Sequence, residues 1–89
     1  MYKEASLRKY KDNITDLHMG LDAVLRLRPV EFDWKDSMGS HDLGFVAEEV
    51  EAVNPLLAEY MDGELRSVKY SKLTALLTKA IQDTLTFCR

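Results

Sequence analysis

Hydrophobic positions repeat with helical spacing in two parts of the 89-residue chain. The first repeat follows an i, i+4, i+7, i+8 pattern and predicts a short helix over about 17–27, which ends before Pro29. The second predicts the main helix over about 71–87, with Ser71 as its N-cap. The first stripe consists of Leu17, Leu21, Val24 and Leu25, and the second of Leu73, Leu76, Leu77, Ala80, Ile81 and Leu85.

Between these helices the pattern changes to that of strands. Residues 30–35 alternate between apolar and charged side chains, which predicts a half-buried strand. Residues 57–68 predict a β-hairpin, because Asp62-Gly63 in the middle supplies the positive φ angles of a two-residue turn. Residues 43–47 are expected to be extended, and residues 48–53 to form a helix that stops at Asn54-Pro55. We therefore expect an α+β fold: a small antiparallel sheet or hairpin, short helices and a longer C-terminal helix.

The composition, with 46% hydrophobic and 30% charged residues, fits one small folded domain. The single cysteine, Cys88, excludes a disulfide framework. His18, His41 and Cys88 are too far apart in sequence to form a metal-ligand motif, so we expect neither a metal nor a cofactor. No stretch approaches the length of apolar chain that crosses a bilayer, so no membrane partner is expected.

The short length of the chain also affects whether copies of it are expected to associate. A chain this short buries only about 60–65% of the surface that its unfolded form exposes. A lone copy should therefore be marginally stable, and association with other copies would stabilise it. The apolar C-terminal helix has two possible roles on pattern alone: it covers the small sheet of its own chain, or it packs against other copies.

Charge is distributed unevenly. Residues 1–30 have a net charge of +2, residues 31–64 of −9 and residues 65–89 of +4, which gives −3 in total. The acidic centre excludes a broad phosphate-binding face, so no nucleic-acid partner is expected. Basic ends and an acidic middle could instead pair between copies of the same chain.

Four phrases, taken together, resemble the C-terminal intramolecular chaperone, or auto-processing, domain of phage tailspikes and tail fibres, of the endosialidase-tailspike type. Each phrase alone is weak, whereas four in this order and spacing, from residue 6 to about residue 83, are specific. They are Ser6-Leu7-Arg8-Lys9-Tyr10-Lys11-Asp12-Asn13-Ile14, Leu27-Arg28-Pro29-Val30-Glu31-Phe32-Asp33-Trp34-Lys35, Gly44-Phe45-Val46-Ala47-Glu48-Glu49-Val50 with Pro55, and Val68-Lys69-Tyr70-Ser71-Lys72-Leu73.

The resemblance implies a homotrimeric module at the end of a longer viral fibre protein. Such a module aligns three chains and helps the upstream portion to fold, and then cuts itself off. The implied catalytic residues are Ser6 as nucleophile and Lys11 as its partner, with Ala5–Ser6 as the cleaved bond. Residues 1–5 would be a remnant of the upstream fibre or of a fusion, and residues 6–89 the chaperone domain. The module would act in the host cytoplasm during virion assembly and leave the mature fibre after cleavage.

The chemistry of cleavage before a serine is direct. The Ser6 hydroxyl can attack the carbonyl carbon of Ala5 to form an ester, which water then hydrolyses. A serine needs a base for this step, and a lysine serves only as the neutral amine, which burial and nearby like charge favour. A spacing of five residues does not bring Ser6 and Lys11 together on a straight strand or a helix. Either the segment bends, or Lys11 acts on a serine of another chain.

One departure from the family pattern leaves an alternative function open. The family usually has Asp directly after the serine, where this chain has Leu7. The alternative is a trimerisation or adaptor module of a viral fibre protein that does not cleave itself.

Overall fold

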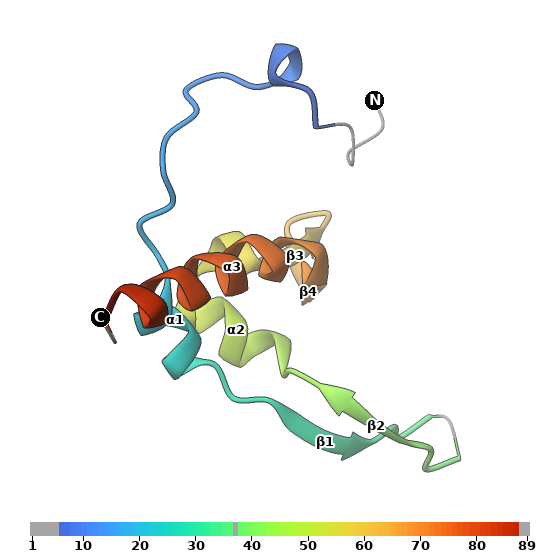
Figure 1. Cartoon of the computed structure of the whole chain (residues 1–89). Coiled ribbons are helices and arrows are strands. Elements are labelled where there is room, and N and C mark those ends of the chain that lie inside the picture. Colours follow the sequence, from blue (N-terminus) through green and yellow to red (C-terminus); the bar gives the residue numbers. More distant parts are fainter. Residues whose placement is uncertain (1–5, 37, 88–89) are drawn as a thin grey trace.

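The computed structural model describes residues 6–36 and 38–87. It combines helices with two small antiparallel hairpins, which confirms the predicted α+β class (Figure 1). The α-helices are α1 (Leu21–Arg26), α2 (Ala47–Val53) and α3 (Tyr70–Phe87), and the short 3-10 helices are η1 (Arg8–Tyr10) and η2 (Pro55–Leu57). The strands are β1 (Val30–Asp33), β2 (His41–Gly44), β3 (Ala58–Met61) and β4 (Glu64–Val68).

The β3–β4 hairpin forms where the Asp-Gly pair predicts it. Asp62 and Gly63 have φ angles of 53° and 81°, both in the left-handed region that a two-residue hairpin turn requires. Met61 pairs with Glu64 across this turn, and the register shifts once, between Glu59 and Tyr60. The strength of this local turn signal explains why the prediction is confirmed.

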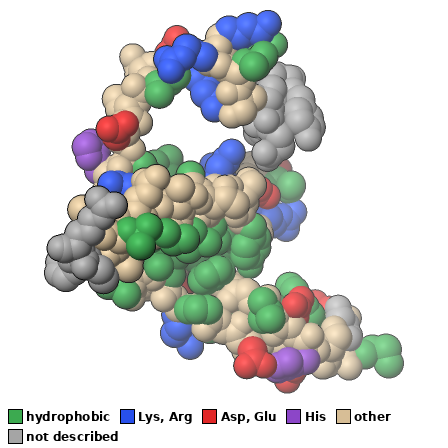
Figure 2. Space-filling view, viewed as in Figure 1, with side chains coloured by type: hydrophobic (Ala, Val, Ile, Leu, Met, Phe, Trp, Pro, Cys, Tyr) green, Lys and Arg blue, Asp and Glu red, His purple; other side chains and the backbone are tan. Residues whose placement is uncertain are grey.

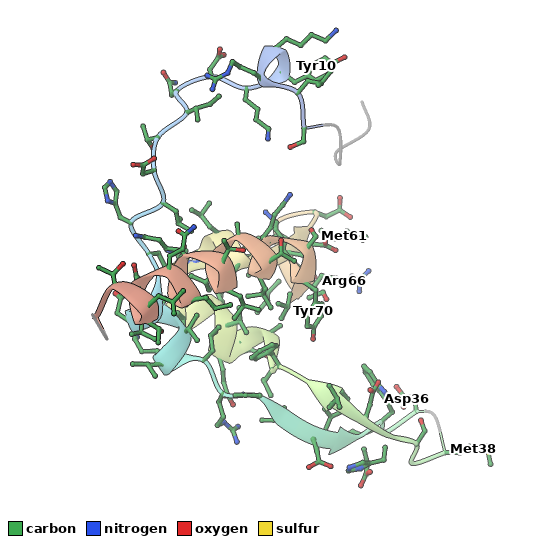
Figure 3. All side chains as sticks on the ribbon, in the orientation of Figure 1. Tyr10, Asp36, Met38, Met61, Arg66 and Tyr70 are labelled. Carbon is green, nitrogen blue, oxygen red and sulfur yellow. The ribbon has the colours of Figure 1, made fainter. Side chains whose placement is uncertain are left out.

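The β1–β2 hairpin projects from the helical body, and Met38 points away from the molecule near its tip (Figure 3). The predicted strand at 30–35 is confirmed over Val30–Asp33, whereas Trp34 lies beyond its end and is 49% exposed. The extended piece expected at 43–47 was misplaced, because β2 starts at His41, opposite Asp33, and ends at Gly44.

The prediction for the first helix was wrong at its N-terminal end. The helix α1 begins at Leu21 rather than near residue 17, and Gly20 occupies the N-cap position. The Asp22 side chain accepts a hydrogen bond from the Gly20 backbone, and Asp83 of α3 accepts one from the Leu21 backbone. These carboxylates bind the N–H groups at the start of the helix and so fix where it begins.

The C-terminal helix is confirmed, but Ser71 is not its N-cap. The helix α3 begins at Tyr70, because the Lys72 N–H already donates to the Lys69 carbonyl at 2.9 Å. Ser71 therefore lies inside the first turn, where its carbonyl accepts from the Thr74 hydroxyl. No helix in the described part of the chain is long and apolar enough to cross a membrane.

The core lies where α1 and η2 pack against α3, and α2 packs against η2 and β4 (Figure 1). One face of α3 is buried there, through Leu73, Leu76 and Ala80. The adjacent face carries an apolar row that we call the outer stripe, and this row is exposed. The outer stripe consists of Leu77 (46% exposed), Ile81 (61%) and Leu85 (63%). The remaining core residues are Ala23, Val50, Leu57, Ala58 and Val68.

The single chain is less compact than its length allows. Its radius of gyration is 15.6 Å, whereas a compact chain of this length has about 12 Å. Its solvent-accessible surface is 7687 Å², against about 5,300 Å² for a folded monomer of the same mass. Two extended features of the described chain contribute to the difference: the β1–β2 hairpin, and the N-terminal arm of residues 6–18 that arcs away from the helices (Figure 1). About 2,400 Å² of surface is thus exposed beyond the amount that a compact monomer shows.

Candidate active site

The N-terminal arm bends at a single 3-10 turn, η1. The Tyr10 N–H donates to the Leu7 carbonyl and the Lys11 N–H to the Arg8 carbonyl, both at 3.0 Å. Because these bonds close turns of the 3-10 type, the chain coils between positions 6 and 11 instead of continuing as a strand. The segment therefore bends, which is one of the two arrangements that the sequence left open.

The bend brings the side chains of Ser6 and Lys11 into contact. The Lys11 Nζ lies 2.6 Å from the Ser6 Oγ and donates a hydrogen bond to it. Both side chains are exposed in the single chain. Ala5, the other residue of the expected cleavage site, lies outside the described residues.

Side chains around η1 add positive charge and apolar surface. Arg8 and Lys9 belong to the same turn, and the Lys9 ammonium lies 5.2 Å from the centre of the Tyr10 ring. Leu7, Tyr10 and Ile14 are between 49% and 61% exposed. The arm that carries the Ser6–Lys11 contact therefore also presents three large apolar side chains to solvent.

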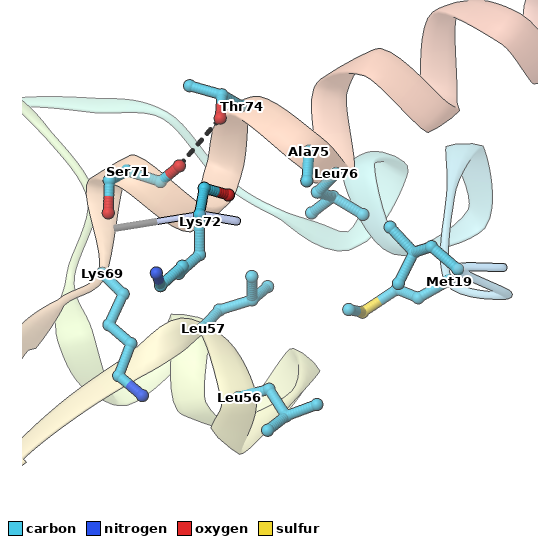
Figure 4. A pocket seen from close by; sticks show the side chains of 11 residues that line it. Met19, Leu56, Leu57, Lys69, Ser71, Lys72, Thr74, Ala75 and Leu76 are labelled. Carbon is cyan, nitrogen blue, oxygen red and sulfur yellow. Dashed lines mark hydrogen bonds between the residues drawn. The ribbon is translucent and has the colours of Figure 1, made fainter. Parts of the chain in front are cut away.

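A cavity of about 500 Å³ lies beside Ser6, between the arm and the start of α3 (Figure 4). Its walls are mainly apolar. Figure 4 shows the side chains of Lys69, just before α3, and Lys72, in its first turn, on the same side of the cavity as Leu57 of η2. The complete lining is Ser6, Leu17, Met19, Leu56, Leu57, Lys69, Ser71, Lys72, Thr74, Ala75 and Leu76.

Sequence reasoning did not associate Lys69 and Lys72 with Ser6. Both belong to the fourth family phrase, but nothing in their spacing places them near residue 6. The proximity depends on the tertiary arrangement of the arm relative to η2 and α3, which has no local sequence signal.

A second polar cluster lies on the β1–β2 hairpin, far from Ser6 in the fold. His41 contacts Asp33 through Nδ1 at 2.7 Å and Glu31 through Nε2 at 3.0 Å. These hydrogen bonds, first to Asp33 and then to Glu31, raise the pKa of His41 above its usual value. Among the described residues, no group of three His, Cys, Asp or Glu side chains has an arrangement that could hold a metal ion.

Two further ion pairs lie in the helical part of the chain. Arg28 donates two hydrogen bonds to Glu49 of α2, at 2.9 and 2.6 Å, which lower the pKa of the Glu49 carboxyl. Lys79 pairs with Asp83 within α3 at 3.0 Å. The hydrogen bond from the Leu21 backbone, followed by the one from Lys79, lowers the pKa of Asp83. These pairs position α1 and α2 against the rest of the chain and are not part of the Ser6 site.

Comparison with known proteins yields one family. The family model Peptidase_S74, described as "Chaperone of endosialidase", matches residues 6–60, which is more than half of the chain. The match begins at Ser6 and includes the arm, α1, the β1–β2 hairpin and α2. Neither the curated proteins nor the solved structures provide a match.

Proposed function

Because the chain belongs to the chaperone of endosialidase family, which is of serine-peptidase type, we propose that it drives trimerisation and folding of an upstream phage tailspike or tail-fibre protein. It would then release itself by cleaving the Ala5–Ser6 bond. It would act as a homotrimer in the host cytoplasm during virion assembly. The upstream partner would be part of the same polypeptide, and the mature fibre would no longer carry the domain.

Exposed apolar surface supports assembly. The single chain exposes about 2,400 Å² more surface, polar and apolar together, than a compact monomer of its mass, and association with other copies would cover part of it. Figure 2 shows hydrophobic side chains gathered over α3 on one face of the molecule. The outer stripe of Leu77, Ile81 and Leu85 repeats every four residues and offers a continuous surface for neighbouring copies.

The chaperone role follows from entropy. Three long chains meet and align slowly, whereas a local trimer at their ends raises their effective concentration to about the millimolar range. Removal of the domain after folding would then trap the fibre kinetically, because the element that helped it to assemble is no longer attached.

Cleavage would proceed in two steps at Ser6. The Lys11 amine, once neutral, accepts the proton of the Ser6 hydroxyl while Oγ bonds to the Ala5 carbonyl carbon. The bond from that carbon to the Ser6 nitrogen then breaks, the nitrogen takes up a proton, and Ala5 is held as an ester on Oγ. Water next attacks the ester, which restores the Ser6 hydroxyl and leaves a carboxylate on Ala5.

The contact of 2.6 Å between Lys11 Nζ and Ser6 Oγ is the observation that carries this proposal. In the structure the ammonium donates to the hydroxyl; with a neutral amine the hydroxyl would donate across the same contact. Because both groups are exposed in one chain, the exclusion of water that favours a neutral amine would come from neighbouring copies.

Mass spectrometry of the full-length polypeptide, including the upstream fibre, tests the proposal. Self-cleavage gives a new N-terminus at Ser6, and Ser6→Ala abolishes it while the protein still trimerises. An intact wild-type protein that trimerises would instead support the non-cleaving adaptor, which Leu7, in place of the usual Asp, favours. A full-length protein that neither cleaves nor trimerises would overturn both functions.

A further inference from the structure

The cavity beside Ser6 combines apolar walls with two lysines. Leu57, a core residue that is 3% exposed, forms part of its floor, and Met19 and Ala75 contribute further apolar wall. Lys69 and Lys72 add two positive charges to the same cavity of about 500 Å³. A cavity of this size is in the range that binds small ligands or a few residues of peptide.

Neither lysine forms a salt bridge with a residue in the described ranges 6–36 and 38–87, although other basic side chains of the domain do. Lys79 pairs with Asp83, and Arg28 pairs with Glu49. Two like charges that share one apolar-walled cavity repel each other, and an anion bound between them would relieve the repulsion. The chemistry of the cavity therefore fits a ligand with a small apolar body and a negative group.

We propose that this cavity binds the chain end that cleavage creates, with the new terminal carboxylate held by Lys69 and Lys72. The inference rests on the proposed function, because Ser6 both contacts Lys11 and lines the cavity. Hydrolysis leaves the carboxylate on the residue that was attached to Ser6, so the anion is produced at the Ser6 end of a cavity that the two lysines also line. The adjoining residues of the upstream chain, beginning with the methyl side chain of Ala5, occupy the apolar part.

Such a site would retain the product after the bond is cut. The upstream fibre would stay bound to its chaperone until the carboxylate leaves the lysines, so cleavage and release would become separate events. Because the attraction is between exposed and half-exposed charges, retention would weaken as ionic strength rises.

Titration of residues 6–89 with two synthetic peptides tests the site. One is Tyr-Lys-Glu-Ala with a free carboxylate, and the other is the same peptide with a C-terminal amide. Residues 6–89 are the fragment that the proposed cleavage would release, and they keep every buried core residue of the described chain, from Ala23 to Ala80; circular dichroism checks that the fragment is folded before the titration. We expect the acid to bind at least tenfold more tightly than the amide at low salt, and the difference to shrink at high salt.

Variants assign the difference to the lysines. Lys69→Met with Lys72→Met should bring the acid close to the affinity of the amide, and Lys35→Met on the distant hairpin should leave the difference unchanged. If circular dichroism shows that the double variant does not fold, the single variants Lys69→Gln and Lys72→Gln replace it. Each single variant should then lose part of the difference in affinity between the acid and the amide. Equal affinities of acid and amide for the wild type, or an unchanged difference in the lysine variants, would overturn the proposal. Failure of cleavage in the full-length protein, by contrast, overturns the proposed function and is measured separately.

Discussion

The Asp83 side chain accepts a hydrogen bond from the backbone N–H of Leu21, with 3.1 Å between Oδ2 and the nitrogen. The bond joins the end of α3 to the start of α1 across 62 residues of sequence. It satisfies one of the N–H groups that the first turn of a helix leaves without a partner. The Lys79 ammonium, 3.0 Å from Oδ1, holds the same carboxylate in place. The position at which α1 begins is therefore set by α3.

This contact makes Gly20 sensitive to substitution. A Cβ at this position would collide with Asp83 Oδ2 and contact the side chain of Lys79. We expect Gly20→Ala to lower the free energy of unfolding by about 1–3 kcal/mol, the usual range for overpacking. Urea denaturation measures the change, and Met38→Ala at the exposed hairpin tip is the control, with an expected change within about 0.5 kcal/mol.

The double variant distinguishes the cause. If the collision with the carboxylate is what destabilises Gly20→Ala, then Gly20→Ala in an Asp83→Ala background should cost less than in the wild type. Strictly additive effects would show that Gly20 matters for another reason.

The β1–β2 hairpin should respond to pH through His41. Its pKa is raised by Asp33 and Glu31, so the folded chain holds the proton more tightly than the unfolded chain does. The stabilisation is fully present below the unfolded value of about 6.5 and is lost as pH rises through the folded value. An NMR titration of the His41 ring should give a midpoint above about 6.5, and Asp33→Asn should lower it. A midpoint that does not change in Asp33→Asn would show that the ion pair is absent in solution.

Structural features that depend on residues nearby in sequence could be predicted, and features that depend on residues far away in sequence could not. The turn at Asp62-Gly63 and the helix ending at Asn54-Pro55 depend on residues within a few positions, and both appear where expected. The start of α1 depends on Asp83, so the apolar spacing around Leu17 extended the predicted helix too far.

In the candidate active site, too, some features could be predicted from the sequence and others depend on the tertiary fold. The family phrase led to the prediction of Ser6 and Lys11 as the catalytic pair, but their spacing left open whether the two residues act within one chain or between two. The bend of η1 is made by backbone hydrogen bonds of Leu7 and Arg8, which have no strong turn signature. The positions of Lys69, just before α3, and Lys72, within it, could not be predicted, because only the tertiary fold brings the two lysines to the cavity.

The proposed role of Lys11 predicts a different result for two neighbouring lysines. Lys11→Arg keeps the positive charge but removes a group that can accept a proton, so self-cleavage of the full-length protein should slow by about 10²–10⁴-fold. Lys9→Arg is the matched control, because Lys9 lies over the Tyr10 ring and not on Ser6. The rate is followed by the appearance of the Ser6 N-terminus in mass spectra. A normal rate in Lys11→Arg would rule out a base at this position.

Mixed trimers test whether the contact acts within one chain. Chains with Ser6→Ala and chains with Lys11→Met are refolded together. In each mixed trimer, an intact Ser6 is then present only in chains that lack Lys11, and an intact Lys11 only in chains that lack Ser6. Because Lys11 contacts Ser6 of the same chain, we expect no cleavage in these trimers. Cleavage of the Lys11→Met chains would show that a neighbouring chain supplies the amine.

The outer stripe of α3 should control assembly without disturbing the core. Ile81 is 61% exposed, whereas Leu76, on the buried face of the same helix, is 1% exposed. Ile81→Lys should therefore leave the single-chain fold intact while it weakens trimerisation at least tenfold, because a charge would be placed in an apolar interface. Sedimentation equilibrium measures the assembly, and circular dichroism the helix content. Gln82→Lys, on the neighbouring exposed position, is the control and should leave assembly unchanged. Leu76→Ala should instead lower the free energy of unfolding by about 2–5 kcal/mol, as expected for a cavity in the core. If Ile81→Lys assembled like the wild type, the copies would have to meet through another surface, such as the arm with Leu7, Tyr10 and Ile14.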